Sequence, residues 1–130
     1  MIHWWRDETH RYQRYMMRPR TPYSGAAERT DSREYRIWLR NLWHRRATKA
    51  RKTWQPYRMK WLPVAECESD RQWYLDGRYD GGLQFAPSTW LHHRGGRYAR
   101  YAYRATPSEQ MAIGERVLHA QGWSAWPNCS

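Results

Sequence analysis

The sequence predicts a mainly α-helical protein, in which a small helical C-terminal domain follows a basic amphipathic helix and an irregular N-terminal arm. Between residues 31 and 54, apolar residues recur at spacings of three and four, the pattern of a helix with one buried face. A Thr-x-x-Glu capping box begins a second apolar stretch at residue 106. No segment alternates apolar and polar residues over the length of a strand, so we expect at most a minimal sheet.

Composition and charge divide the chain into three predicted parts, residues 1–30, 31–57 and 58–130. Residues 1–60 contain 16 Lys/Arg and 5 Asp/Glu, whereas residues 61–130 contain 7 of each. The formal net charge of +11 therefore lies entirely in the N-terminal half. Such asymmetry indicates that one half binds a polyanion and that the other half has a different task.

The first 30 residues are predicted to form an arm or linker. They lack sustained apolar periodicity, and Pro19, Pro22 and Gly25 interrupt regular structure. They also lack the apolar core of a signal peptide, and the chain has no run of 18 apolar residues that would span a membrane. For a protein that acts outside the cytoplasm, this predicts delivery in a phage virion or release at cell lysis.

Residues 31–57 are predicted to form a helix that begins with a capping box of Asp31 and Glu34 and ends at Pro56. Its apolar stripe consists of Tyr35, Trp38, Leu39, Leu42, Trp43, Ala47, Ala50 and Trp54. Its basic face consists of Arg36, Arg40, Arg45, Arg46, Lys49, Arg51 and Lys52. Three partners remain open for such a helix. They are a neighbouring domain or second copy, an anionic envelope or membrane surface, and, least favoured, nucleic acid.

Residues 58–130 are predicted to hold three helices. The first is short and covers residues 58–69, and the second begins near Pro87. The last is bounded by clear signals, because Thr106 provides a cap and Gly122 a stop.

Glu68 is the candidate catalytic residue. It lies near the end of an apolar helical turn and precedes an aromatic loop that begins at Trp73. A carboxyl group against aromatic surface is desolvated, which raises its pKa. A carboxylic acid with a raised pKa can protonate a leaving oxygen near neutral pH. The spacing alone favours an ordinary surface glutamate over a catalytic one, and the neighbouring Glu66 could serve equally.

The cysteine and histidine content predicts neither a metal site nor a cofactor. Cys67 and Cys129 are the only cysteines, and neither belongs to a CxxC pair or stands near a histidine at metal-ligand spacing. His92 and His93 are predicted to be solvated loop residues. A domain of about 70 residues buries little surface, so a disulfide would help to stabilise it.

The string WLPVAECES, followed in order by GGLQFAPSTW, EQ, GERVL and QGWSAWPNC, resembles the resuscitation-promoting-factor, or transglycosylase-like, domain of actinobacteria and their phages. The resemblance covers residues 61–129. It implies a small lysozyme-like fold that cleaves the β-1,4 glycan strands of peptidoglycan, as a lytic transglycosylase or a muramidase, with the transglycosylase favoured. It also implies that Glu68 is the general acid and base and that Cys67 and Cys129 form a disulfide.

The resemblance further implies a set of substrate-binding residues, which are Trp73, Tyr79, Gly82, Gln84, Thr89, Trp90 and Gln110. Trp61 and Trp126 match positions that are expected in the core. The chain departs from the family beside the acid, because Asp70-Arg71 replaces the usual Gly-Gly and the loop that follows is shorter.

These departures leave a second class of function open. The domain would then be a non-catalytic cell-wall-binding module or a structural module of a phage particle, with residues 1–57 as a polyanion-binding arm. That arm is expected to contact phage structural proteins or an anionic envelope surface. For the enzyme and for the wall-binding module the expected partner is peptidoglycan, and the expected place of action is the cell wall.

Overall fold

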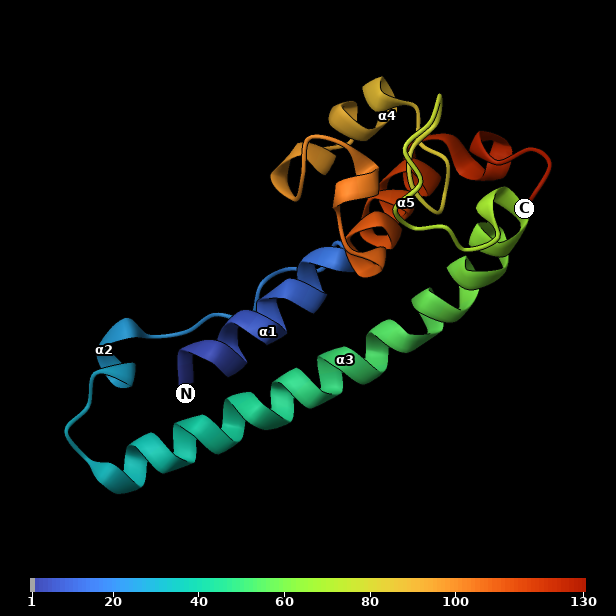
Figure 1. Cartoon of the computed structure of the whole chain (residues 1–130). Coiled ribbons are helices and arrows are strands. Elements are labelled where there is room, and N and C mark those ends of the chain that lie inside the picture. Colours follow the sequence, from blue (N-terminus) through green and yellow to red (C-terminus); the bar gives the residue numbers. More distant parts are fainter. Residues whose placement is uncertain (1) are drawn as a thin grey trace. The chain divides into compact units, whose positions relative to one another are not determined.

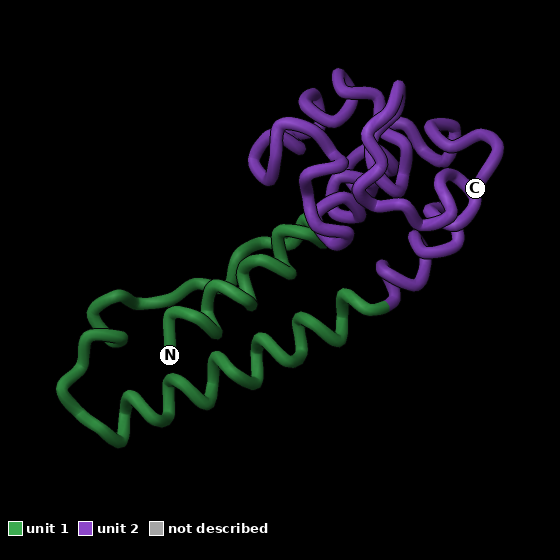
Figure 2. The backbone as a smooth tube through the Cα atoms, in the orientation of Figure 1, with its two compact units in different colours: residues 1–55 green, residues 56–130 purple. Residues whose placement is uncertain are grey.

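The structure is a computed structural model that describes residues 2–130. The chain divides into two compact units, one up to residue 55 and one covering residues 56–130 (Figure 2). Its helices are α1 (Ile2–Tyr15), α2 (Gly25–Glu28), α3 (Arg33–Ser69), α4 (Pro87–His92) and α5 (Pro107–Gln121), with short 3₁₀ turns at Gly95–Arg97, Ala102–Arg104 and Gly122–Ala125 (Figure 1). The predicted mainly helical fold is confirmed. Within residues 2–130, the only β-structure is an isolated antiparallel bridge between Asp80 and Phe85.

The prediction of an irregular arm over residues 1–30 is wrong, because α1 occupies about half of this segment. The buried face of α1 includes two polar residues, Thr9 and His10, which break the apolar pattern. The Thr9 hydroxyl donates to the Trp5 carbonyl at 2.9 Å, and His10 Nε2 lies 2.9 Å from the Thr21 carbonyl oxygen. Because these polar groups have partners, they can be buried at little cost.

In the first unit, α1 packs along the N-terminal part of α3, and the two helices run in the same direction (Figure 1). Ile2 of α1 forms a cluster with Leu39 and Trp43 of α3. Further along, the Tyr15 ring lies 5.2 Å from the ring of Trp54. The apolar stripe of α3 therefore contacts a helix of its own unit, which the sequence analysis treated as an irregular segment.

Helix α3 does not end at Pro56 as predicted. It is 37 residues long in total, ends at Ser69 and contains both Pro56 and Pro63. The expected separate helix over residues 58–69 is its last part. Each proline removes one backbone hydrogen bond. Both prolines lie on the exposed face, where water can satisfy the freed carbonyls, while Trp54 and Trp61 are buried seven residues apart on the other face. The start also differs by one residue, because Ser32 Oγ accepts the Tyr35 N–H at 3.2 Å.

The second unit contains the predicted helices α4 and α5. Helix α5 begins with the expected reciprocal capping box, in which Thr106 and Glu109 each accept the other's backbone N–H, and Gly122 follows its last residue. These predictions are confirmed because capping depends on residues close together in sequence. Taken together, the helices of residues 2–130 include none that is long and apolar enough to cross a membrane.

The core of the second unit is built around tryptophans, as predicted for Trp61 and Trp126. Their ring centroids lie 4.8 Å apart, and both side chains are buried. Trp61 Nε1 donates to Glu115 Oε1 at 2.8 Å, and the Trp126 indole donates to the Leu83 carbonyl at 2.9 Å. Glu115, which is buried, also pairs with the Lys60 ammonium group. The buried indole N–H groups of Trp61 and Trp126 and the buried carboxylate of Glu115 therefore all have partners.

A disulfide joins Cys67 to Cys129 and confirms the predicted pairing. Its Cα atoms lie 5.5 Å apart, and the two residues are separated by 62 positions in sequence. The bridge ties the C-terminal segment of the chain to the last turn of α3. Glu68 is the next residue along that turn.

Candidate active site

Glu68 lies in the last turn of α3 and is half-buried. Burial raises the pKa of its carboxyl group above the ordinary value for a glutamate. Among residues 2–130, no hydrogen-bond or ion-pair partner of this carboxyl group is found that would stabilise its charged form. Desolvation without a compensating donor favours the protonated acid, as a proton donor to a leaving group requires.

Ser69 connects the end of α3 to the loop that faces it, a role the sequence analysis did not assign. Its hydroxyl donates to the Gly82 carbonyl at 2.9 Å and accepts the Gln72 N–H at 3.1 Å. The side chain is buried. Ser69 therefore fixes the position of the loop at Gly82 relative to the turn that carries Glu68.

The helix terminates through two consecutive residues in the left-handed region, Asp70 and Arg71, with φ values of 56° and 58°. Side chains disfavour this conformation, whereas glycine adopts it freely. The backbone nevertheless remains bonded, because the Asp70 N–H donates to the Glu66 carbonyl at 3.0 Å and the Arg71 N–H to the Ala65 carbonyl at 3.1 Å. Asp70 and Arg71, which replace the Gly-Gly that the resemblance led us to expect, thus occupy positions where glycine would be unstrained.

Gln110 is fully buried and holds three backbone groups of the loops beneath the site. Its Oε1 accepts the Gly82 N–H at 2.9 Å. Its Nε2 donates to the Trp73 carbonyl at 2.8 Å and to the Ala105 carbonyl at 3.0 Å. These bonds use both polar ends of the amide, so Gln110 holds the backbone of Trp73, Gly82 and Ala105 without reaching the surface itself.

Gly82 is required by the ring that packs on it. A Cβ atom built at this position would lie 2.3 Å from Trp73 Cε3, inside the contact distance of any real Cβ. At Gly81, which has a φ of 76°, a Cβ would lie 2.3 Å from Gln110 Oε1. The positive φ of Gly81 therefore favours glycine there, and at Gly82 the missing side chain makes room for the Trp73 indole.

Two aspartates lie in the loop between Trp73 and Gly81, and their environments differ. Asp76 is exposed, whereas Asp80 is buried. Burial raises the pKa of Asp80, and the charge of Asp76 raises it further, while a hydrogen bond from the Gly77 backbone opposes both effects. The Asp80 backbone also pairs with Phe85 through bonds of 2.8 and 2.9 Å.

The other predicted substrate-binding residues separate into surface and buried groups. Tyr79 is 47% exposed, and Trp73, Gln84 and Thr89 are partly exposed. Gln84 Nε2 donates to the Gly81 carbonyl at 2.8 Å, which holds this side chain against the glycine turn. Trp90, by contrast, is fully buried, and its indole donates to the Ala99 carbonyl at 2.8 Å. Trp90 and Gln110 therefore do not reach the surface on which a glycan would lie.

A network of contacts brings Glu68, Trp73 and Gln84 to one region of the second unit. Ser69 bonds to Gly82, Gly82 lies under the Trp73 ring, and Gln84 bonds to the adjacent glycine. The site thus combines one protonatable carboxyl group with an aromatic side chain and an amide. Within residues 2–130, no group of three or more His, Cys, Asp and Glu is arranged to hold a metal ion.

Residues 55–129 match the model of the transglycosylase-like domain family, which is more than half of the chain. Resuscitation-promoting factor Rpf1 of Corynebacterium glutamicum is 49% identical over 72 residues, which are 54% of this chain and 37% of that protein. RpfA of Mycobacterium tuberculosis is also 49% identical over 72 residues, 54% of this chain and 18% of that protein. The resuscitation-promoting factor of Micrococcus luteus is 39% identical over 72 residues, 54% of this chain and 31% of that protein.

The chain thus spans between about a fifth and about two fifths of the length of these relatives. The matched region coincides with the second unit and includes the disulfide and Glu68. These comparisons confirm the resemblance that the sequence motifs indicated. Residues 1–54 lie outside the matched family region.

Proposed function

Because the chain belongs to the transglycosylase-like domain family, we propose that residues 56–130 cleave the β-1,4 glycan strands of peptidoglycan with Glu68 as the catalytic residue. The observation that carries this proposal is the carboxyl group of Glu68, which is half-buried, has a raised pKa and has no partner that stabilises its charge. A group of this kind retains its proton closer to neutral pH and can deliver it to the glycosidic oxygen.

The proposed reaction uses this carboxyl group twice. Glu68 first donates its proton to the bridging oxygen, and the bond between that oxygen and C1 of the cleaved sugar breaks. The C6 hydroxyl of the same sugar then attacks C1, and its proton passes to the Glu68 carboxylate. The enzyme returns to its starting state, and the product carries a 1,6-anhydro end.

The state of the two loop aspartates favours a mechanism without a second carboxylate. Glycosidases that use two carboxylates need the second one ionised, as a nucleophile or as a base that activates water. Asp80 is buried with a raised pKa, and its backbone is fixed in the bridge to Phe85. Asp76 is exposed to solvent. Asp80 is buried in the loop and Asp76 points into solvent, so neither is placed to act as the second carboxylate of direct hydrolysis, and we favour the transglycosylase over the hydrolase.

Trp73, Tyr79, Gln84 and Thr89 are proposed to contact the glycan, since their side chains are at least partly exposed in the same unit. An aromatic ring with a polar edge suits a sugar, which has an apolar face and a polar rim. Gly82, Trp90 and Gln110 are proposed to act indirectly, by holding the loops that present these side chains.

Mass spectrometry of the products released from purified actinobacterial cell walls tests this proposal. The expected result is anhydro ends from the wild type and no release by Glu68→Gln. Asp80→Asn and Asp76→Asn serve as matched controls and are expected to remain active. Reducing ends without anhydro products would refute the transglycosylase outcome. Full activity of Glu68→Gln would refute the assignment of the acid, and binding of glycan strands by the wild type without turnover would favour a non-catalytic module.

A further inference from the structure

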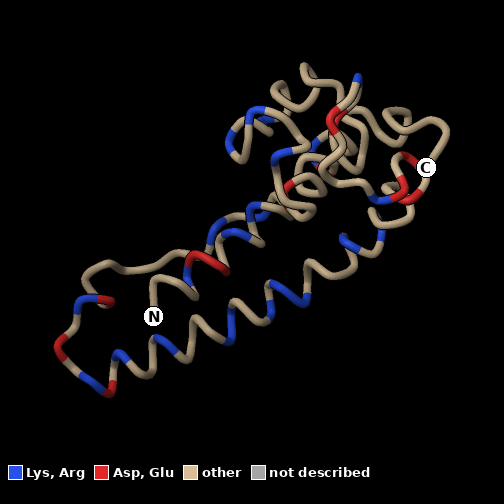
Figure 3. The backbone as a smooth tube through the Cα atoms, viewed as in Figure 1, with Lys and Arg blue, Asp and Glu red and all other residues tan. Residues whose placement is uncertain are grey.

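The exposed face of α3 in the first unit carries basic residues that have no acidic counterpart nearby in sequence. Residues 35–65 contain nine Lys/Arg and no Asp/Glu. Basic residues follow the helix along most of its length, whereas its acidic residues lie near its two ends (Figure 3). The first unit as a whole contains 14 Lys/Arg and 5 Asp/Glu, a net charge of +9.

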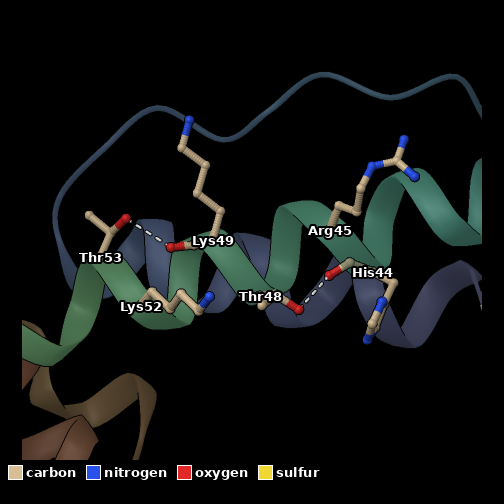
Figure 4. A pocket seen from close by; sticks show the side chains of 6 residues that line it. All are labelled: His44, Arg45, Thr48, Lys49, Lys52 and Thr53. Carbon is tan, nitrogen blue, oxygen red and sulfur yellow. Dashed lines mark hydrogen bonds between the residues drawn. The ribbon is translucent and has the colours of Figure 1, made fainter.

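Three of these basic residues, Arg45, Lys49 and Lys52, line a shallow hollow of about 560 Å3 on this face, together with His44, Thr48 and Thr53 (Figure 4). The cations recur once per helical turn, so a spacing of roughly 5 Å along the axis separates each from the next. All three are exposed. Within the part of the chain that the structure describes, no ion pair is found for any of them.

Several basic residues elsewhere in the chain have acidic partners. Arg6 pairs with Glu28, Arg11 with Glu8, and Arg71 with Glu66. The two threonines of the hollow are also occupied, because Thr48 donates to the His44 carbonyl at 2.9 Å and Thr53 to the Lys49 carbonyl at 2.8 Å (Figure 4). Arg45, Lys49 and Lys52 therefore have no acidic partner among the described residues and are available to bind an external anion.

We propose that the face of α3 formed by Arg45, Lys49 and Lys52 binds a linear phosphate polymer of the cell envelope, laid along the helix axis. A flexible chain with one phosphate per repeat matches a row of cations that recurs once per turn. Binding would neutralise several phosphates and release their counterions, so it would weaken with salt. The identity of the polymer as a wall component rests on the proposed function, whereas the phosphate binding itself does not.

Membranes and nucleic acids are bound through groups that the hollow itself does not supply. A helix that binds a lipid bilayer inserts an apolar face, whereas Leu39 and Trp43 of the apolar stripe of α3 are packed against α1. Single-stranded nucleic acid is held by aromatic rings that alternate with the cations, whereas the other residues of the hollow are His44, Thr48 and Thr53. The exposed Tyr35 and Trp38 lie outside the hollow, nearer the start of α3. The hollow thus provides charge without a tryptophan or tyrosine that could insert or stack.

The binding would add to the proposed action of the second unit. When the first unit holds the chain on the polymer, the second unit meets the glycan at a raised effective concentration. The chain is then retained longer on the wall without any new contact to the glycan. The two events remain separable, because the hollow and Glu68 lie in different units.

Titration of the full chain with long-chain inorganic polyphosphate at several salt concentrations tests the proposal. The test variant is Arg45→Gln/Lys49→Gln/Lys52→Gln, and the matched control is Arg14→Gln/Arg18→Gln/Arg20→Gln. The control makes the same change in net charge at exposed positions elsewhere in the first unit. Glutamine is a good helix former, and circular dichroism verifies that helix content is kept.

The test variant is expected to bind at least tenfold more weakly than the wild type. The slope of log affinity against log salt is expected to fall by about 2, at about 0.7 for each lost phosphate contact. The control is expected to change affinity less than threefold. Equal weakening by both variants would overturn the proposal in favour of a diffuse charge effect, and unchanged binding by the test variant would overturn it directly.

Competition identifies the source of the phosphate. Polyphosphate bound to the full chain is expected to resist displacement by single-stranded DNA and by vesicles of anionic phospholipid at equal phosphate concentration. Displacement by either competitor would overturn the proposal in favour of that class of partner, nucleic acid or membrane. Glu68→Gln is expected to bind polyphosphate like the wild type, and the test variant is expected to cleave soluble glycan fragments at the wild-type rate. Failure of the catalytic proposal would leave these binding results unchanged.

Discussion

Replacement of Gln110 by alanine tests whether a buried amide organises the candidate active site. The change removes the partners of three backbone groups, the Gly82 N–H and the carbonyls of Trp73 and Ala105. A buried backbone group left without a partner costs about 1 kcal/mol or more. The lost packing costs about 1 kcal/mol besides. We therefore expect the second unit to lose about 4 kcal/mol, a large share of the roughly 5–15 kcal/mol that stabilises a domain.

Gln110→Glu separates hydrogen bonding from volume, because it keeps the shape of the side chain. The neutral acid still accepts from Gly82 and donates one bond, so its cost is about 1 kcal/mol. The ionised acid would face two carbonyl oxygens, which raises its folded-state pKa above the unfolded value. A raised folded pKa means that the variant is best folded at low pH and loses stability as the pH rises through that pKa.

Urea unfolding of the full chain, followed by the amide signals of residues 56–130 in NMR spectra, measures these effects unit by unit. Hydrogen exchange at the Gly82 amide reports the local bond directly. Ser108→Ala, on the same helix, is the control and is expected to change stability by less than about 0.5 kcal/mol. A cost below 1 kcal/mol for Gln110→Ala, with unchanged exchange at Gly82, would refute the reasoning.

Three further predictions concern the same unit. Gly82→Ala is expected to displace the Trp73 ring, cost about 1–3 kcal/mol and shift tryptophan fluorescence, whereas Gly77→Ala, whose Cβ would meet only an oxygen at 3.5 Å, changes little; equal effects would contradict the packing argument. Reduction of the disulfide is expected to cost about 4 kcal/mol in urea unfolding, because the bridge closes a 62-residue separation; a cost below 1 kcal/mol would contradict this. Because burial raises the pKa of Glu68, cleavage is expected to fall as the pH rises through that raised pKa, and wild-type stability falls over the same range. Glu68→Gln removes this decline, so the wild type is expected to lose more stability than the variant between pH 4 and pH 8. An equal change in the free energy of unfolding of both proteins would contradict this.

The parts of this structure that depend on neighbouring residues were predictable from sequence. Helix α5 is bounded by the capping pair Thr106 and Glu109 and by Gly122, all within short reach of the chain they terminate. Glu68 and the disulfide were placed through an ordered set of motifs rather than through composition, and the disulfide is confirmed. The catalytic role of Glu68 and the phage association stay predictions.

The parts that depend on distant partners were not predictable. α1 was missed because its buried Thr9 and His10 are polar, and only their bonds to Trp5 and Thr21 make that burial affordable. The continuation of α3 through Pro56 was missed because a proline in sequence does not say which face of a helix it will occupy. The seven-residue interval between Trp54 and Trp61 was the available signal that one stripe runs through the proline.

Gln110 shows the same limit within the candidate site. A glutamine near the start of α5 was predicted to touch the glycan, yet its three partners lie between 5 and 37 positions away and enclose it completely. Trp90 was likewise expected to bind the glycan, but it is fully buried and its indole donates to the Ala99 carbonyl. Our proposal is that both residues support the site from inside the domain. A sequence motif identifies such residues without showing whether their side chains reach the surface.

The interlocked arrangement of Gly82, Trp73 and Gln110 has a consequence for how this sequence can diverge. A side chain at position 82 is compatible only with a smaller residue at 73, and a smaller residue at 73 leaves space over the loop that the amide at 110 secures. The three positions are therefore expected to covary among descendants of this chain. Single replacements should be rare, and a change at one position should be accompanied by compensation at the others.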